Sequence, residues 1–178
     1  MFEVNNHIQP LSLVAEQDEL SLYEYSPTLL KLTLVPLEAM SLIRRCRLLS
    51  EKIRGGYKIY YLAQKGKLVG YCVVTPGGRR LKCTTKNDVV IGPYFICPDS
   101  RGKGLSKMMI KLVLAEIGSQ YISAYDWIYQ GNAPSIHCME ACGFRTIGRL
   151  DVVGKFRLLK ESANGPYVIM KYDFCINT

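Results

Sequence analysis

The most constraining feature of this sequence is a glycine-punctuated turn that joins an apolar run to an amphipathic segment. The apolar run covers residues 89–97, and the turn Arg101-Gly-Lys-Gly-Leu-Ser106 follows shortly after Pro98. The first turn of a helix carries unpaired N–H groups and the positive end of the helix dipole, which together favour an anion such as phosphate. Gly102 and Gly104 lack Cβ atoms, so a phosphate can come close to the backbone. The sequence therefore predicts a phosphate-binding turn at the end of a strand.

Length and composition indicate one globular domain over residues 1–178. Hydrophobic residues make up 48% of the chain and charged residues 21%, which is ordinary for a soluble protein with one sizeable core. No apolar run approaches the roughly 18 residues that a membrane-spanning helix needs. The first residues lack the basic start and apolar stretch of a secretory signal. We therefore expect a cytoplasmic protein with no membrane partner.

The cysteines favour reduced thiols over a disulfide framework. There are seven of them, an odd number, and no C-x-x-C pair occurs. Cys138 and Cys142 lie one helical turn apart beside His137, which is a partial zinc pattern. No further ligand pair at finger-like spacing accompanies them, so we expect no metal.

The net charge of +8 favours an anionic partner, either nucleic acid or a phosphorylated small molecule. The basic residues are dispersed, and no motif of interleaved, base-stacking aromatic residues accompanies them. We therefore expect a small-molecule partner and no nucleic-acid partner.

Hydrophobic periodicity and turn residues predict a mixed sheet with helices packed on it, hence an α/β or α+β fold. The predicted helices cover residues 36–54, 101–117 and a short segment after Asn132, and the predicted strands cover 57–63, 68–75, 88–97, 122–129, 144–153 and 167–174. In the first helix the apolar face comprises Ala39, Leu42, Ile43, Cys46, Leu49 and Ile53. Gly92-Pro93 interrupts the strand 88–97, so its pairing should fail locally there.

Two linked motifs resemble those of the GNAT superfamily of acetyl-CoA-dependent N-acetyltransferases. The turn at 101–106 matches that family's R/Q-x-x-G-x-G/A pattern, with Ser106 in place of the final small residue. A second block matches the family's N-x-x-A/S…E-x-x-G-F helix through Asn132, Ser135, Ile136, Glu140, Gly143 and Phe144. The resemblance covers about residues 88–148, and the first 55 residues match only loosely. It implies a mixed, mostly antiparallel central sheet flanked by helices, with a splayed strand pair that binds coenzyme A.

The resemblance also implies which residues hold acetyl-CoA, a co-substrate of this family that needs no metal. Backbone amides of residues 102–106 would hold the pyrophosphate, and pantetheine would lie along residues 94–96 like an extra strand. The implied coenzyme-binding residues are Tyr94, Phe95, Ile96, Arg101, Gly102, Lys103, Gly104, Leu105, Ser106, Asn132 and Ser135. The amide of Ile96 would polarise the thioester carbonyl as an oxyanion donor. Asn132 has a plain alternative role as a helix cap.

The second block departs from the family at Met139, where a tyrosine usually protonates the leaving thiolate. Releasing an unprotonated thiolate at neutral pH costs about 2 kcal/mol, whereas deprotonating an alkylammonium costs roughly 4–5 kcal/mol. A catalytic base therefore matters more than the acid. Asp126, on an apolar strand face, and Asp88, at a strand start, are candidate bases. Tyr129 and Tyr94 are candidate acids.

These observations predict an N-acetyltransferase that moves the acetyl group of acetyl-CoA to a primary amine of a small molecule by direct attack. The sequence does not distinguish between an amino sugar, a nucleotide-linked amino sugar and a peptide N-terminus as the acceptor. A homodimer is a further possibility that the sequence leaves open. A GNAT-fold module that senses acyl-CoA without turnover is the alternative, because of Met139. Acceptor contacts are expected outside residues 88–148, from Arg44, Arg45 and Arg47 or from the loop with Arg79, Arg80 and Lys82.

Overall fold

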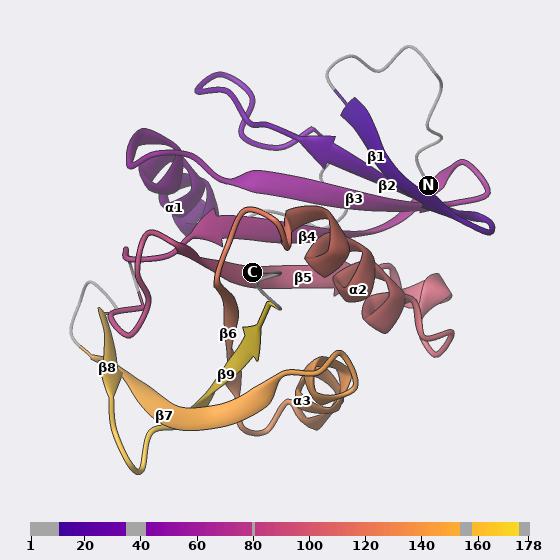
Figure 1. Cartoon of the computed structure of the whole chain (residues 1–178). Coiled ribbons are helices and arrows are strands. Elements are labelled where there is room, and N and C mark those ends of the chain that lie inside the picture. The colour runs from indigo at the N-terminus through magenta and orange to yellow at the C-terminus, as the bar shows by residue number, and fades with distance from the viewer. Residues whose placement is uncertain (1–10, 35–41, 80, 154–157, 175–178) are drawn as a thin grey trace. The chain divides into compact units, whose positions relative to one another are not determined.

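The computed structural model, which describes residues 11–34, 42–79, 81–153 and 158–174, divides the chain into two units of sheet and helix (Figure 1). The first comprises Met1–Thr75 and Gly92–Glu116, and the second comprises Pro76–Ile91 and Ile117–Thr178. Strand β5 (Asp88–Ile96) contributes its first half to the second unit and its second half to the first. That residues 1–178 form a single domain stays a prediction.

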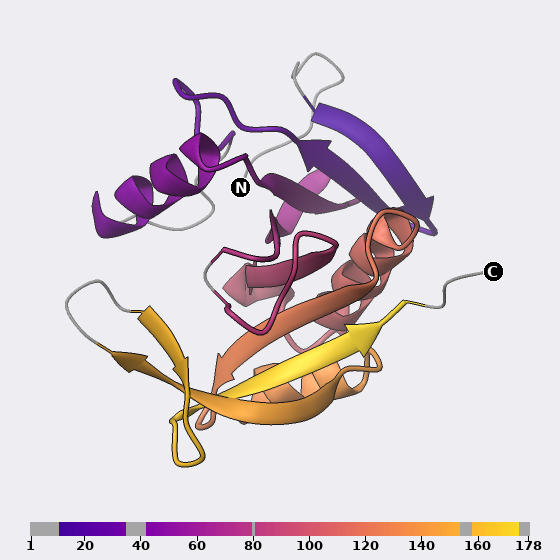
Figure 2. The same ribbon diagram turned by 60° about the vertical axis from the view of Figure 1, so that its left-hand side comes forward.

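The first unit is built on an antiparallel sheet in the order β1-β2-β3-β4-β5. Its first four strands are β1 (Leu11–Gln17), β2 (Leu20–Tyr25), β3 (Lys58–Gln64) and β4 (Lys67–Pro76). Its helices are α1 (Leu42–Ile53), the short 3₁₀ helix η1 (Pro98–Ser100) and α2 (Leu105–Ile117). Figure 2 shows α1 and α2 on different faces of this sheet.

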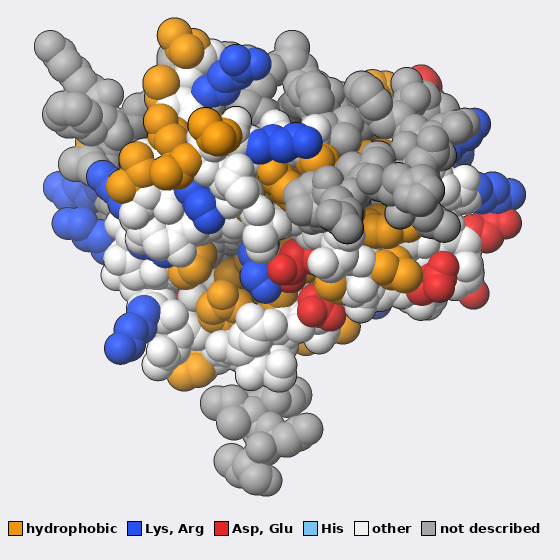
Figure 3. All heavy atoms as spheres, turned by 90° about the horizontal axis from the view of Figure 1, so that it is seen from above, with side chains coloured by type: hydrophobic (Ala, Val, Ile, Leu, Met, Phe, Trp, Pro, Cys, Tyr) orange, Lys and Arg blue, Asp and Glu red, His pale blue; other side chains and the backbone are white. Residues whose placement is uncertain are grey.

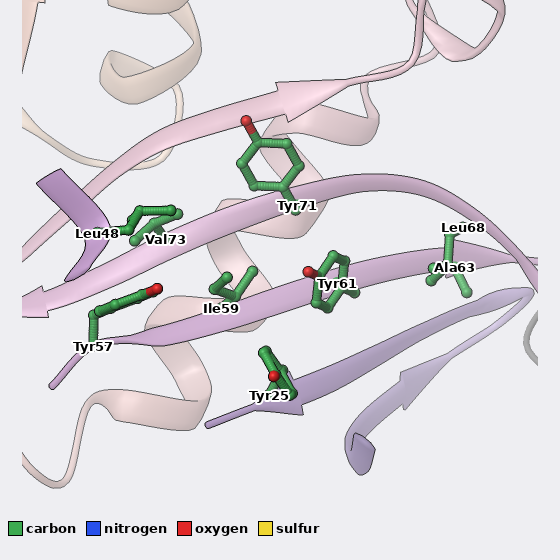
Figure 4. Packing of buried hydrophobic residues seen from close by; sticks show 9 residues of the cluster. All are labelled: Tyr25, Leu48, Tyr57, Ile59, Tyr61, Ala63, Leu68, Tyr71 and Val73. Carbon is green, nitrogen blue, oxygen red and sulfur yellow. The ribbon is translucent and has the colours of Figure 1, made fainter. Parts of the chain in front are cut away.

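An aromatic cluster covers the α1 face of this sheet. Because side chains alternate along a strand, alternate residues of β2, β3 and β4 point to this face, apart from a shift of one residue in β4 where Ala63 pairs with Leu68. The buried members are Tyr25, Leu48, Tyr57, Ile59, Tyr61, Ala63, Leu68, Tyr71 and Val73 (Figure 4). Leu48 is the contribution of α1, so the cluster ties that helix to the sheet.

Residues 28–34, which we call the strap, are held over the aromatic cluster by three tyrosine hydroxyls. The Tyr25 hydroxyl donates to the carbonyl of Lys31 at 2.6 Å, and the Tyr57 hydroxyl donates to the carbonyl of Leu32 at 2.7 Å. The Tyr61 hydroxyl accepts the N–H of Leu34 at 3.1 Å. Burial raises the pKa of Tyr25 and of Tyr57, which keeps both phenols protonated as donors.

The second unit contains the order β5-β6-β9-β7-β8. The strands are β6 (Ser123–Tyr129), β7 (Arg145–Val153), β8 (Leu158–Glu161) and β9 (Tyr167–Asp173), with helix α3 (Ala133–Glu140) after β6. All pairs are antiparallel except β5–β6, a parallel ladder from Asp88–Ser123 to Val90–Tyr125. The core of this unit is formed by Leu81, Tyr125, Leu150, Leu159 and Ile169.

The ladder between β5 and β6 ends just before the predicted interruption. Its last pair is Val90–Tyr125, and Gly92 follows with a φ of 113° and a cis peptide bond to Pro93. That φ favours glycine, since a Cβ is strained there. The interruption read from Gly92-Pro93 is therefore present in the backbone.

The predicted strands and helices are confirmed within a few residues wherever the structure describes them, apart from three strands that the sequence did not reveal: β1, β2 and β8. The start of the first predicted helix, including Ala39, lies outside the described residues. The described members of its predicted apolar face do not pack inside: Leu42, Cys46 and Ile53 are exposed, and Leu49 is 37% exposed, while the side chain of Ile43 lies outside the described residues. The buried side of α1 instead carries Leu48 and Glu51.

No helix in the described part of the chain is long and apolar enough to cross a membrane.

Candidate functional site

The glycine turn is formed by a short chain of backbone hydrogen bonds after β5. The N–H of Cys97 donates to the carbonyl of Val69 at 2.8 Å, and the pairing of β5 with β4 ends there. The N–H of Ser100 then donates to Cys97 at 2.9 Å, and that of Arg101 donates to Pro98 at 3.1 Å. Helix α2 begins at Leu105. Like any helix start, it presents N–H groups that have no carbonyl one turn earlier to bind.

Both glycines of the turn are required by the backbone and not by packing. Gly102 has a φ of 77° and Gly104 a φ of 73°, in the left-handed region that favours glycine. A Cβ built on either residue would meet no atom within 4 Å, so the space beside each is open. A ligand can therefore approach the backbone of this turn directly, as the sequence predicted.

Arg101 fastens the turn to the end of β5. Its Nε donates to the carbonyl of Ile96 at 3.0 Å, and its guanidinium carbon lies 5.4 Å from the centre of the Phe95 ring. That ring stacks on Tyr71 of the aromatic cluster at 5.9 Å. The contacts seen here give Arg101 a positioning role, and its expected binding of the coenzyme stays a prediction.

The remaining expected coenzyme residues of the first unit lie on the same continuous segment. Tyr94 and Phe95 are half-buried on β5, Ile96 is buried, and Leu105 packs inward at the start of α2. Lys103 is exposed and its Nζ contacts the carbonyl of Asp99 at 3.4 Å, while Ser106 is half-buried. The segment thus joins a strand and a helix start through one exposed turn.

Sequence reasoning missed Gly70, which lets β4 and β5 approach closely. A Cβ on Gly70 would lie 2.6 Å from the carbonyl oxygen of Phe95 and 2.5 Å from Cδ1 of Ile96. Any side chain there would push the second half of β5 away. The only available signal was a glycine inside a strand, which often marks a close backbone approach.

In the second unit, Asp126 is a buried carboxyl on an apolar strand face. It is 6% exposed and alternates along β6 with Ala124 and Ile128, both buried. Its Oδ1 accepts the N–H of Trp127 at 2.7 Å. Burial raises the pKa of Asp126 to about 7, and the Trp127 hydrogen bond offsets only part of that shift. A group that titrates near neutral pH is suited to general acid or base work.

The alternative base, Asp88, is occupied in holding a loop. Its Oδ2 accepts the N–H of Thr85 at 2.7 Å and the Thr85 hydroxyl at 2.8 Å. These bonds close a turn directly before β5, where Asp88 is buried. A structural role therefore accounts for this carboxylate.

Tyr129 and Asp126 are not brought to one face of β6. Alternation points Trp127 and Tyr129 to the face opposite Asp126. Both rings lie against Tyr167, with centroid distances of 5.2 Å and 5.8 Å, and Tyr129 is 54% exposed. The other candidate acid, Tyr94, belongs to the first unit. The catalytic roles of Asp126, Tyr129 and Tyr94 stay predictions.

The second motif block folds as the capped helix that the sequence indicated. The Asn132 side chain accepts the N–H of Ser135 at 3.4 Å, and Pro134 lies in the first turn of α3. Asn132 is exposed and Ser135 half-buried. Met139 is completely buried. The binding of coenzyme by Asn132 and Ser135 stays a prediction.

The basic residues expected to contact an acceptor are only partly described. Arg45 and Lys82 are exposed and Arg79 is half-buried, whereas Arg80 and the side chains of Arg44 and Arg47 lie outside the described residues. Lys82 lines a hollow of about 380 Å³ whose apolar wall includes Leu81, Leu150 and Leu159.

Within the described ranges, no group of three or more His, Cys, Asp or Glu residues could hold a metal.

Comparisons with known proteins agree with this geometry. The sequence profile of the acetyltransferase (GNAT) family matches residues 29–144, and no curated protein sequence matches the chain. Among solved structures, the ribosomal-protein-S18-alanine N-acetyltransferase of Escherichia coli aligns over 88% of this chain and 96% of its own, with a TM-score of 0.59 and 14% identity. Spermidine N-acetyltransferase from Vibrio cholerae, in complex with CoA and spermine, aligns over 78% and 79%, with a TM-score of 0.54 and 17% identity. Aminoglycoside acetyltransferase AAC(6')-Ib, in complex with coenzyme A and kanamycin, aligns over 74% of both chains, with a TM-score of 0.56 and 17% identity.

These likenesses establish the fold, a mixed α/β architecture with a large, mostly antiparallel sheet flanked by helices. The predicted fold class is confirmed. The family profile spans more than half of the chain, including β5, the glycine turn and α3. This chain belongs to the acetyltransferase (GNAT) family.

Proposed function

We propose that this protein is an N-acetyltransferase that moves the acetyl group of acetyl-CoA to a primary amine of a small molecule. The carrying observation is the exposed turn at residues 101–106, where Gly102 and Gly104 leave open space beside the backbone at the start of α2. An oriented row of amides at a helix start suits the pyrophosphate of coenzyme A. Family membership and neighbours that were solved with CoA bound support the same ligand.

The proposed reaction is a direct attack without a covalent enzyme intermediate. The amine nitrogen forms a bond to the thioester carbonyl carbon, the carbon–sulfur bond breaks, and the electron pair leaves on the coenzyme A sulfur. The products are an acetamide and coenzyme A. The amide of Ile96 is the proposed donor to the oxygen that becomes negative in the transition state. The proton released from the amine goes to a base.

Asp126 is the proposed base. With a pKa of about 7, its carboxyl is partly ionised at neutral pH and can accept a proton from an amine under attack. An ordinary aspartate, with a pKa near 3.9, would be a much weaker base. The missing family tyrosine at Met139 is then less important, since unprotonated thiolate release costs only about 2 kcal/mol.

The acceptor is proposed to be a small-molecule amine such as an amino sugar or a nucleotide-linked amino sugar. Two neighbours are named for, or bound to, polyamine and aminoglycoside ligands, which supports the amine class. Another neighbour is named for a ribosomal-protein alanine, so a peptide N-terminus belongs in the test. Cytoplasmic location and a homodimer stay predictions.

A second candidate function is an acyl-CoA sensor without turnover. The specific observation behind it is that Met139 stands at the position of the family's general acid and is completely buried. A sensor would bind acetyl-CoA through the same turn and would release no coenzyme A when amines are added.

The test measures free coenzyme A after mixing protein and acetyl-CoA with a panel of amines that contains kanamycin, spermidine, glucosamine, a UDP-linked amino sugar and a peptide with a free N-terminus. Amine-dependent release supports the transferase and rejects the sensor. Acetyl-CoA binding by calorimetry without release from any amine supports the sensor. A folded protein that binds no acetyl-CoA contradicts both functions.

A further inference from the structure

Helix α1 carries an apolar ridge that faces solvent. Its members are Leu42, Cys46, Leu49 and Ile53, spaced four, three and four residues apart, so they line up along one side of the helix. Leu42 is 76% exposed, Leu49 37% and Ile53 70%, and Cys46 is exposed as well. Leu48 and Glu51, both 7% exposed, occupy the side that packs inward. A continuous apolar ridge on a solvent-facing helix indicates an interaction surface.

The strap adds a second exposed apolar point on the same side of the sheet. Leu29 is 61% exposed and Leu30 is fully exposed, at 101%. Leu32 and Leu34 of the strap pack on the aromatic cluster to which α1 contributes Leu48, so the strap and α1 cover one face. Figure 3 shows hydrophobic and basic side chains intermingled on the side of the molecule where α1 and the strap lie. We call the exposed side chains of residues 28–34 and 42–54 the α1–strap surface.

The α1–strap surface is cationic. Lys31, Arg45 and Arg54 are exposed and Lys52 is half-buried, while the one acidic residue in these two segments, Glu51, is buried. A second copy of the chain in a two-fold contact would place these like charges against one another, which disfavours association. The partner that fits is anionic and accepts apolar side chains.

We propose that the α1–strap surface docks on an anionic lipid bilayer. The exposed leucines and isoleucine would enter the boundary between headgroups and acyl chains, and the flanking lysine and arginine side chains would contact anionic headgroups. At 12 residues, α1 is long enough to lie along the interface and too short to span it. This departs from the sequence-based expectation of no membrane partner, which rested on the lack of a membrane-spanning run and of a secretory signal and did not consider a surface contact.

The test is co-sedimentation of the whole protein with vesicles of phosphatidylcholine alone or with 30% phosphatidylglycerol. At 100 mM salt we expect at least tenfold stronger partitioning to the anionic vesicles, and most of that gain should be lost at 500 mM salt. Leu42→Ser combined with Ile53→Ser should weaken partitioning about tenfold. Arg45→Ala combined with Arg54→Ala should remove most of the preference for phosphatidylglycerol.

The matched control replaces exposed aliphatic residues elsewhere. Leu13→Ser combined with Ile122→Ser removes side chains that are 54% and 47% exposed, and should leave partitioning unchanged. Far-ultraviolet circular dichroism and melting temperature verify that each variant is folded.

Three results would overturn the proposal. One is wild-type protein that does not bind the anionic vesicles. Another is vesicle binding that the α1 variants and the control weaken equally. The third is a dimer in light scattering that Leu42→Ser with Ile53→Ser dissolves, because a second copy would then cover the ridge. The assay contains no acetyl-CoA, so its outcome is separate from that of the proposed activity.

Discussion

The two motif blocks use their polar and glycine residues in different ways. In the β5–α2 turn, Gly102 and Gly104 adopt positive φ angles beside open space, and nothing in the packing of the turn calls for them. In the β6–α3 region, polar residues already have local partners: Asn132 of the second block caps α3, and Asp126, on the strand before that block, accepts the N–H of Trp127. The first block thus leaves room for the proposed coenzyme, whereas helix capping already explains much of the second.

The comparison teaches where a motif match is strong evidence. Gly66 shows the same positive φ beside open space in a plain hairpin turn, so these features support a ligand at Gly102 and Gly104 only together with the motif match and the helix start that follows them. A residue that satisfies its own helix or strand would be present with or without a ligand. The buried, ionisable Asp126, on β6 just before the second block, is an exception, because an apolar residue would fill its site at lower cost.

The largest expected effect is on the pH dependence of stability, and it tests whether Asp126 is an ionisable group and not merely a packed one. Its folded-state pKa of about 7 lies well above the ordinary aspartate value of about 3.9, so the folded state holds the proton more tightly. The free energy of unfolding should therefore fall as pH rises from about 4 to 7, by roughly 1.4 kcal/mol for each pH unit, relative to Asp126→Asn. Urea unfolding at several pH values measures this. Asp173, whose pKa is held at about 2 mainly by Lys171, titrates below the window. Parallel pH curves for wild type and variant would contradict the shift.

The next effect is on turnover, and it would give the β6–α3 region a catalytic role beyond its local structural contacts. If Asp126 is the base, Asp126→Asn should lower kcat at least about 100-fold, because general base catalysis contributes typically that much. Wild-type kcat should rise with pH around 7, since the base must be deprotonated. Affinity for acetyl-CoA, measured by calorimetry, should stay within threefold. If kcat of Asp126→Asn is unchanged, Asp126 is not the base and its role is structural.

A smaller effect, at least tenfold in affinity, sharpens the assignment of the first block. Gly104→Glu would place a carboxylate and a strained Cβ where the coenzyme phosphates are proposed to lie, and should weaken acetyl-CoA binding by about 1.4 kcal/mol or more. Gly66→Glu is a matched control: Gly66 also has a positive φ, 72°, and open space, but lies in the β3–β4 turn. Calorimetry on both folded variants decides, and equal losses would mean that strain alone is responsible.

The smallest effect separates capping from ligand binding in the second block. Asn132→Ala should lower the free energy of unfolding by about 1 kcal/mol, the usual cost of losing an N-cap. Asn132→Ser keeps a capping oxygen and serves as the control. If the cap is the whole role, acetyl-CoA affinity should change less than threefold in both variants. A larger loss of affinity that Asn132→Ser does not restore would give Asn132 a direct contact with the coenzyme.

The sequence predicted most of the elements after residue 55 because their local signals agree with the final packing. The Gly66 turn, the Gly92-Pro93 interruption and the Asn132 cap are local events that depend on a few neighbouring residues. The glycine turn was found for the same reason, since Gly102 and Gly104 act through their own backbone. The strands β1, β2 and β8 were not found. β1 and β8 stand at the two ends of the strand order and pair with a strand next to them in the chain, whereas β2 also pairs with the distant β3.

The errors and gaps have a common cause in tertiary context. Periodicity marked an apolar face on α1 but could not show that this face points to solvent while Leu48 packs inward. Gly70, a glycine inside a strand, could indicate a close backbone approach but not that Phe95 is the partner. The raised pKa of Asp126 depends on burial that only the folded unit provides. The opposite facings of Asp126 and Tyr129 follow from alternation once the bounds of β6 are known.

The three tyrosine bonds to the strap all end on backbone atoms, the carbonyls of Lys31 and Leu32 and the N–H of Leu34. The course of this segment is consequently set by these bonds, together with the packing of Leu32 and Leu34 and the Thr28 hydroxyl, which accepts the N–H of Lys31. Outward-facing residues such as Leu29 and Leu30 can be exchanged without redirecting the chain. The exposed residues of the strap can therefore change during evolution, and with them the chemistry of this surface, while the sheet beneath keeps its packing.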